Sequence, residues 1–249
     1  MIDLAFTRPS DRMEESLRMA REMGINAIAA PSLIIRKGDA DEFERLSTVL
    51  PRSDILIFAS ESAVDHVLRE MDEDEVDLIR GKKVISIGSV TRDRLMKSGI
   101  SSIEPHEHNS DGVVRLIGDE APGKVVVTLR SNKGSSVIRK GLTDLGAEVH
   151  EILAYKVLPC SMGMEMEVLL STDVKCLALT SPASVDAFMG LAEEYLGKAG
   201  LDEYIERVKV AVIGLPTKRA IEEHGYVVDI LPKASTFKGL LLAIKGCEE

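Results

Sequence analysis

Side chains that could bind an anion recur in pairs where apolar runs of this chain end. The paired residues are Ser60 and Ser181, Thr91 and Thr217, and Arg8 and Arg130. A helix N-terminus with free N–H groups and a small hydroxyl side chain is a ready site for a carboxylate or phosphate. The same Ser and Thr residues also serve as ordinary helix caps, and capping is compatible with binding. Several such positions facing one cleft would hold a polycarboxylate without a strongly basic protein.

Tyr155 offers a different chemistry. It is one of four tyrosines and lies in the extended sequence EILAYKVLP. A phenol that faces a ligand can donate a hydrogen bond or a proton to a leaving group. The alternative is an amphipathic packing residue on a strand.

The sequence carries no familiar catalytic or metal motif. The patterns GxGxxG, P-loop, GxSxG and HExxH do not occur. His106 and His108 lie two apart in an acidic loop without further ligands at metal-site spacing, so exposed loop histidines are expected instead. The three cysteines are odd in number and widely spaced, which favours a reducing cytoplasm over a disulfide framework.

Charge and hydrophobicity exclude other classes of partner. The 249 residues include 41 acidic and 31 basic side chains, a formal net charge of -10. A basic face for nucleic acid or an anionic membrane is therefore not expected. No apolar run approaches the ~20 residues of a membrane span.

The second half of the chain repeats the first. The matched stretches are Ile2–Lys37 with Lys124–Leu158, Asp54–Met71 with Lys175–Ala192, and Lys83–Ile117 with Lys209–Ile244. The spacing is far longer than the ~20–50 residues of solenoid repeats. It predicts two copies of one domain-sized unit, with a ligand site between them as the default expectation.

Each copy opens with a strand, a turn, a helix and a second strand. In the first copy these are Ile2–Thr7, a helix capped by Ser10 or Asp11 and ended by Gly24, and the strand Ile25–Ala30. Runs such as ILIF and VVVT are continuously apolar rather than alternating. Such strands are buried on both faces, which predicts an α/β fold with parallel sheets covered by helices.

The position of two connectors indicates interleaved domains. Residues 31–36 and 154–159 form a matched pair of extended connectors. With two connectors, one domain can be formed by both ends of the chain and the other by the continuous segment between them. We therefore predict domain 1 as residues 1–34 plus 158–249, domain 2 as 37–154, and a connector of 35–36 and 155–157. A simple break near Gly123 is the alternative.

These residues together resemble the uroporphyrinogen-III synthase family over nearly the whole chain. The motifs that carry the resemblance, in family order, are Thr7-Arg8-Pro9, FASESAVDHVL at 58–68, IGSVTRDRL at 87–95, Leu129-Arg130, AYKVLP at 154–159, LTSPASVDAF at 179–188 and IGLPTKRAI at 213–221. The family commonly has Thr-Ala after the glycine-containing turn, whereas this chain has Thr91-Arg92 and Thr217-Lys218.

The resemblance implies two flavodoxin-like domains joined by a two-stranded connector, with no cofactor and no metal. It implies cyclisation of hydroxymethylbilane, a linear tetrapyrrole with eight carboxylates, to uroporphyrinogen III with inversion of ring D and loss of water, within heme biosynthesis. Tyr155 matches the family tyrosine that assists departure of the hydroxyl. The paired residues then become substrate-binding positions. A cytoplasmic monomer that meets hydroxymethylbilane synthase transiently is the corresponding expectation.

Two other classes of function remain open at this point. The first is a non-catalytic two-domain module that closes on a tetrapyrrole or another anion, or a regulatory homologue. The second is an unrelated enzyme on the same fold, since fold alone gives no function.

Overall fold

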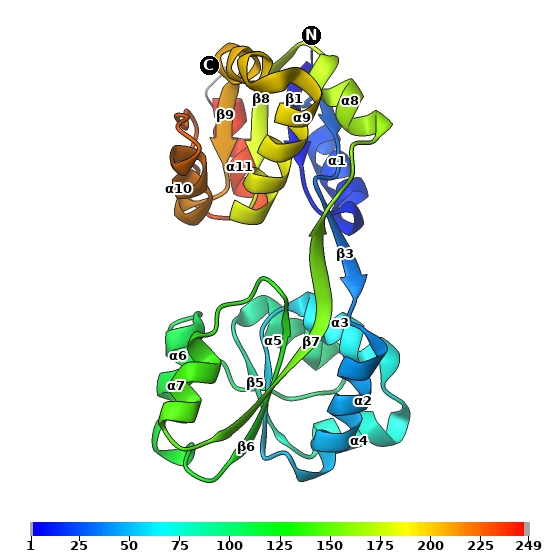
Figure 1. The fold of residues 1–249 in the computed structure, drawn as a ribbon, viewed down its shortest axis with the longest axis vertical. Helices are drawn as coiled ribbons and strands as arrows, with labels where there is room; N and C mark the ends of the chain where they lie inside the picture. The colour runs from blue at the N-terminus through cyan, green and yellow to red at the C-terminus, as the bar shows by residue number, and fades with distance from the viewer. Residues whose placement is uncertain (1, 247–249) are drawn as a thin grey trace. The chain divides into compact units, whose positions relative to one another are not determined.

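The computed structural model describes residues 2–246 and divides the chain into two compact units. Unit 1 comprises Met1–Ile35 and Leu158–Glu249, and unit 2 comprises Arg36–Val157. The chain crosses between them within β3 (Leu33–Lys37) and β7 (Glu148–Pro159), which are neighbours in one sheet (Figure 1). The crossings thus occur in the segments predicted as connectors, and no division falls near Gly123.

Unit 1 is built on a four-stranded parallel sheet in the order β2-β1-β8-β9. Its strands are β1 (Ile2–Thr7), β2 (Ala27–Ala29), β8 (Val174–Leu179) and β9 (Lys209–Val212). Its helices are the 3-10 turn Ser10–Arg12, α1 (Met13–Glu22), α8 (Met164–Ser171), α9 (Pro182–Arg207), α10 (Leu215–Glu223) and α11 (Phe237–Gly246).

Both faces of this sheet are buried, as the continuous apolar runs predict. Ala5 and Leu177 pack with residues of α8, α9 and α10 on one face. Their strand neighbours Leu4 and Cys176 pack with α1 and α11 on the other. Because successive side chains of a strand point to opposite faces, a sheet covered twice needs apolar residues at every position.

Unit 2 contains a five-stranded sheet in the order β3-β7-β6-β4-β5. Besides β3 and β7, its strands are β4 (Ile55–Phe58), β5 (Lys83–Ser86) and β6 (Val125–Ser131). Its helices are α2 (Ala40–Val49), α3 (Glu61–Glu70), α4 (Glu73–Arg80), α5 (Ser89–Lys97), α6 (Ser110–Ile117) and α7 (Val137–Asp144), with 3-10 turns at Leu50–Arg52 and Gly118–Glu120. In Figure 1, α6 and α7 lie on one side of this sheet and α2 and α4 on the other.

The two units have the same strand order once the sequence repeat is followed. The repeat matches β6, β7, β4 and β5 with β1, β2, β8 and β9, and each set is arranged second-first-third-fourth. This is the doubly wound order of flavodoxin-like sheets. Each unit therefore contains one part of each sequence copy, and the α/β fold with two parallel-dominated sheets is confirmed.

The start of α1 corrects one prediction. The sequence predicts Ser10 or Asp11 as the cap, but both belong to a 3-10 turn, and the N-cap of α1 is Arg12, which makes no side-chain cap hydrogen bond. The reason is Pro9, whose carbonyl accepts the Arg12 N–H at 3.0 Å and so tightens the chain before the helix begins. The predicted end of this helix is confirmed, since Gly24 adopts a φ of 75°.

Candidate active site

The predicted site residues lie near or just beyond the carboxyl ends of parallel strands, except Tyr155, which lies within β7 and pairs with Ser131 at the end of β6. In unit 2 they are Ser60 after β4, Thr91 after β5, Arg130 at the end of β6, and Tyr155 on β7. In unit 1 they are Arg8 after β1, Ser181 after β8, and Thr217 after β9. Carboxyl ends of parallel strands share one edge of a sheet, and that edge is where open α/β sheets bind ligands. Each unit therefore gathers its own members of the set.

Ser60 and Tyr155 are in direct contact. Ser60 is the N-cap of α3, in an extended conformation, and its Oγ accepts the Ala63 N–H at 3.2 Å. The same Oγ lies 2.9 Å from the hydroxyl oxygen of Tyr155. The structure thus joins two residues that are 95 positions apart in the sequence.

Tyr155 sits at an irregularity in the sheet. Arg130 pairs with Leu153 and Ser131 pairs with Tyr155, so the register between β6 and β7 shifts by one residue at this point. Such bulges interrupt the strict alternation of a strand and re-aim a side chain, and they are frequent beside active sites. Tyr155 is 8% exposed.

Asn132 secures β7 just beyond the shift. Its Nδ2 donates to the Val157 carbonyl at 3.2 Å, and its Oδ1 accepts the Val157 N–H at 2.8 Å. The side-chain amide therefore replaces a backbone pairing, and the backbone of Tyr155 is held on both sides of the irregularity.

An imidazole covers one face of the Tyr155 ring. The His66 ring on α3 is stacked on it, with centroids 5.6 Å apart and an interplanar angle of 16°. The phenol is therefore held at its oxygen by the cap of α3 and at its face by a residue of the same helix.

Ser181 is the counterpart of Ser60 but has different partners. It caps α9, and its Oγ accepts the Ser184 N–H at 3.1 Å. The Ser184 Oγ in turn accepts the Ser181 N–H at 2.9 Å, which completes a capping box.

Thr91 and Thr217 are third residues of α5 and α10, not caps. The N-caps are Gly88 and Gly214, which have no side chain to bond the first N–H groups. Both threonines are buried, at 5% and 2% exposure. The structure therefore places each beside a helix N-terminus that no side chain caps.

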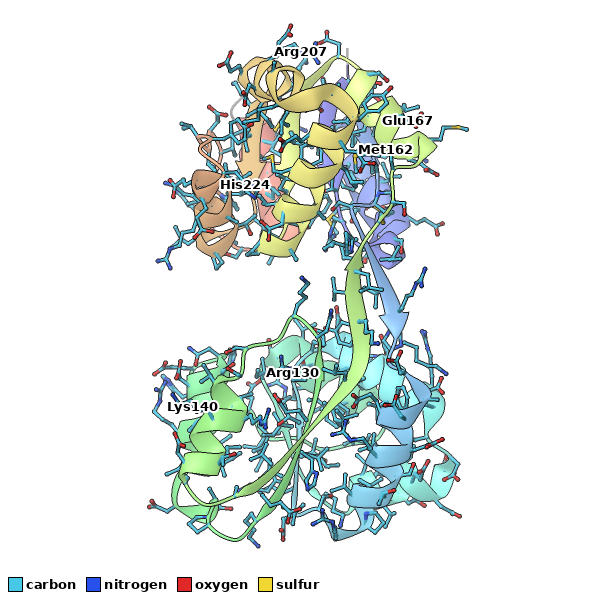
Figure 2. The ribbon with its side chains drawn as sticks, viewed as in Figure 1. Arg130, Lys140, Met162, Glu167, Arg207 and His224 are labelled. Atoms are coloured by element: carbon cyan, nitrogen blue, oxygen red, sulfur yellow. The ribbon has the colours of Figure 1, made fainter. Side chains whose placement is uncertain are left out.

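The two predicted arginines are turned to their own units. Arg8 donates to the Ser16 Oγ at 2.7 Å and lies over the Phe237 ring at 4.7 Å. Arg130, labelled in Figure 2, is 9% exposed and holds the loop that follows β6. Its partners are the carbonyls of Ser131, Gly134 and Ser135 and the carboxylate of Glu151. Substrate binding by either arginine stays a prediction.

Among residues 2–246, no group of three or more His, Cys, Asp or Glu side chains is arranged to hold a metal ion. His106 and His108 are exposed in the loop before α6, as the sequence predicts.

None of the described helices is both long and apolar enough to span a membrane.

Comparison with known proteins decides the family. Residues 12–242 match the family model described as uroporphyrinogen-III synthase HemD. The chain belongs to the uroporphyrinogen-III synthase family. Its reaction is the cyclisation of hydroxymethylbilane to uroporphyrinogen III, with inversion of ring D and loss of water, which makes it a lyase of porphyrin biosynthesis.

Individual relatives of the uroporphyrinogen-III synthase family match nearly the whole chain. A protein of Methanothermobacter thermautotrophicus is 29% identical over 247 residues, which cover 97% of this chain and 96% of that protein. The uroporphyrinogen-III synthase of Chlorobaculum parvum is 26% identical and covers 91% of each chain. A mutant uroporphyrinogen III synthase from Thermus thermophilus has a similar fold, with a TM-score of 0.71, 18% identity and coverage of 100% of this chain and 99% of that one.

The motifs of the uroporphyrinogen-III synthase family did not reveal every residue at this edge. His66 lies inside the quoted motif FASESAVDHVL, but nothing in its spacing predicts a stack on Tyr155. Asn132 follows the quoted Leu129-Arg130 turn by two residues, and only its pairing with Val157 shows its part in holding β7.

Proposed function

We propose that in this cyclisation the Tyr155 phenol acts on the hydroxyl group that departs from ring A of hydroxymethylbilane. The observation that carries the proposal is the 2.9 Å contact between Ser60 Oγ and the Tyr155 hydroxyl at the carboxyl edge of unit 2. A phenol fixed at such an edge is within the region where α/β sheets bind ligands. A positioned tyrosine is a recognised general acid.

The contact with Ser60 leaves the Tyr155 proton available. Ser60 Oγ accepts the Ala63 N–H with one lone pair, and its own hydrogen remains for donation. When Ser60 donates to Tyr155, the phenolic O–H can point to the departing hydroxyl. As that proton moves, the negative charge that grows on the phenol oxygen keeps the Ser60 donor, which stabilises it.

The later steps follow from loss of the hydroxyl. Departure of water leaves an azafulvene at ring A, which the substituted carbon of ring D attacks. The spiro intermediate then fragments and recloses with ring D inverted. These steps rearrange carbon–carbon bonds within the substrate, so the contribution of the protein is to hold the rings in the productive order.

Each unit has helix N-termini at its own sheet edge that are suited to binding substrate carboxylates. α5 and α10 begin at Gly88 and Gly214, so their first N–H groups face no capping side chain of their own. Backbone N–H groups at a helix N-terminus favour an anion through hydrogen bonding and the helix dipole. Thr91, Thr217 and Ser181 would add hydroxyl groups beside them.

The cell context is part of the same proposal. The odd number and wide spacing of the cysteines support a cytoplasmic protein. We expect it to act as a monomer and to receive its unstable linear substrate from hydroxymethylbilane synthase in a transient encounter.

A coupled assay tests the reaction and the role of Tyr155 together. Hydroxymethylbilane is generated in situ, the protein is added, and the oxidised uroporphyrins are separated by chromatography. Since the substrate closes unaided to isomer I, we expect the protein to shift the product to isomer III. Tyr155→Phe should lower kcat by about 10²-fold, the low end for general acid catalysis, and still give isomer III.

Tyr195 in unit 1 supplies a matched control. It is exposed, and Tyr195→Phe also removes a single phenolic hydroxyl, so its rate should be unchanged. A wild-type rate for Tyr155→Phe would remove the acid role. Isomer I alone from the folded wild-type protein would instead favour a binding or regulatory homologue.

A further inference from the structure

We infer that His66 is a positioning residue that fixes the plane of the Tyr155 ring and thereby the direction in which the phenolic proton is delivered. The inference rests on the proposed role of Tyr155. Its basis is the parallel stack of the two rings, at 5.6 Å between centroids and 16° between planes.

A hydrogen bond at the phenol oxygen does not orient the ring by itself. The 2.9 Å contact with Ser60 fixes the position of the oxygen, but the ring can still turn about the line from Cβ to that oxygen. A phenolic O–H prefers the plane of its ring, because the oxygen lone pair is conjugated with the π system. The ring plane therefore decides where the proton points, and a stacked imidazole restricts that plane.

The sheet and Asn132 hold the backbone of Tyr155 but do not fix the rotation of its ring. The register shift between Arg130 and Ser131 breaks the pairing of β6 with β7 immediately before Tyr155. Contacts to the side chain must then hold the ring. The hydrogen bond and the stack both come from α3 and its N-cap residue Ser60.

α3 is itself a fixed support. Val64 and Val67, on either side of His66, are fully buried. Asp65 accepts a hydrogen bond from the Arg94 Nε of α5 at 2.5 Å. The imidazole is therefore carried by a helix anchored both to the core and to the helix that contains Thr91.

The test is a series of substitutions at His66 measured in the coupled assay. Ala and Leu remove the aromatic face, whereas Phe retains it without ring nitrogens. Ala has the highest helix propensity, so His66→Ala should leave α3 formed, which circular dichroism checks. We expect His66→Ala and His66→Leu to lower kcat about three- to tenfold with KM unchanged, and His66→Phe to recover most of the rate.

The matched control is His224, a histidine of unit 1 labelled in Figure 2. It is on the surface and its ring lies 3.0 Å from Asp186, so His224→Ala should have the wild-type rate. A KM change in place of a kcat change at His66 would overturn the inference. So would a failure of His66→Phe to recover the rate, because the stack would then not be the cause.

The double variant His66→Ala with Tyr155→Phe separates this inference from the proposed function. If His66 acts through the phenolic hydroxyl, His66→Ala should cause no further loss once that hydroxyl is gone. An equal loss in both backgrounds would overturn the role of His66. A slow Tyr155→Phe with a wild-type His66→Ala overturns only the His66 inference, whereas a wild-type rate for Tyr155→Phe rejects the proposed function itself.

Discussion

Units 1 and 2 present the same kind of sheet edge, and the Tyr155 phenol belongs to that of unit 2. Each edge has a serine that caps a helix, Ser60 or Ser181, and a glycine N-cap followed by a buried threonine. The strand that carries Tyr155 in unit 2 is the continuous β7 (Glu148–Pro159), whereas the repeat matches it with residues 26–37, which form two shorter strands, β2 and β3. The same repeat spacing that matches Arg8 with Arg130 matches Leu33 with Tyr155, and Leu33 is buried.

The difference separates features that both units share from features that occur around Tyr155 in unit 2. The shared helix termini are suited to binding acidic groups in both units. The register shift, the long strand and the His66 stack occur together around Tyr155 in unit 2. Each edge is thus suited to an anion, and the proposed proton donor belongs to unit 2.

The largest expected effect tests a feature that the units share. Gly112 and Gly239 are the third residues of α6 and α11, and a Cβ on either would overlap a backbone carbonyl, that of Glu107 or Ala234. A carbonyl in the backbone cannot move aside as a flexible side chain does. We therefore expect Gly112→Ala and Gly239→Ala each to lower the free energy of unfolding by about 3 kcal/mol, the upper range for overpacking.

Urea unfolding measures this effect, and hydrogen exchange locates it. Protection should fall in unit 2 for Gly112→Ala and in unit 1 for Gly239→Ala. Gly190 in α9 is the control, because a Cβ there meets nothing within 4 Å and alanine should stabilise the helix by about 1 kcal/mol. Unchanged stability in either of the first two variants would mean that the shared loop geometry is not required.

An effect of intermediate size is expected at the helix caps Ser60 and Ser181, which differ in their contact with Tyr155. Ser60→Ala and Ser181→Ala each remove a helix cap and should cost about 1 kcal/mol of stability. Ser60 touches Tyr155, so Ser60→Ala should also lower kcat, by about two- to tenfold for one hydrogen bond. Ser181 is a proposed substrate-binding residue without that contact, so Ser181→Ala should act mainly on KM. Equal kcat values for the two variants in the coupled assay would contradict the assignment of the acid to unit 2.

The smallest effect concerns one Lys–Asp ion pair in each unit. Lys175 Nζ lies 2.8 Å from Asp3 in unit 1, and Lys124 Nζ lies 3.1 Å from Asp54 in unit 2. Hydrogen bonds hold the pKa of both carboxyls below the ordinary value of 3.8, chiefly from Lys175 to Asp3 and from the Val125 N–H to Asp54. Both pairs are partly exposed, so Asp3→Asn and Asp54→Asn should each cost less than about 1 kcal/mol near pH 7.

The pH dependence follows from the direction of those shifts. A carboxyl with a depressed pKa in the folded protein stabilises it above the unfolded pKa, and this stabilisation is lost as the pH falls through the folded value. The stability difference between the wild type and each Asn variant should therefore shrink from about pH 4 downward. Urea midpoints measured from about pH 7 to about pH 2.5 check this, and a difference that grows on acidification would contradict it.

The α/β class, the repeat and the residues near the strand ends can be predicted from the amino-acid sequence. These are local properties, since continuous apolar strands, glycine helix ends and helix-start residues are visible within a few positions. The sequence was less informative at α1, where Pro9 tightens the chain and displaces the predicted cap to Arg12.

Tertiary structure alone decided which of these residues meet. Ser60 and Tyr155 are brought together because β4 and β7 flank β6 in the sheet, an order that no spacing in the sequence states. The register shift beside Tyr155 and the stack with His66 depend on the pairing of strands and the packing of α3. Local sequence fixes the propensity of each segment, but a contact between segments is set by how all of them pack, and the chemistry of this edge lies in such contacts.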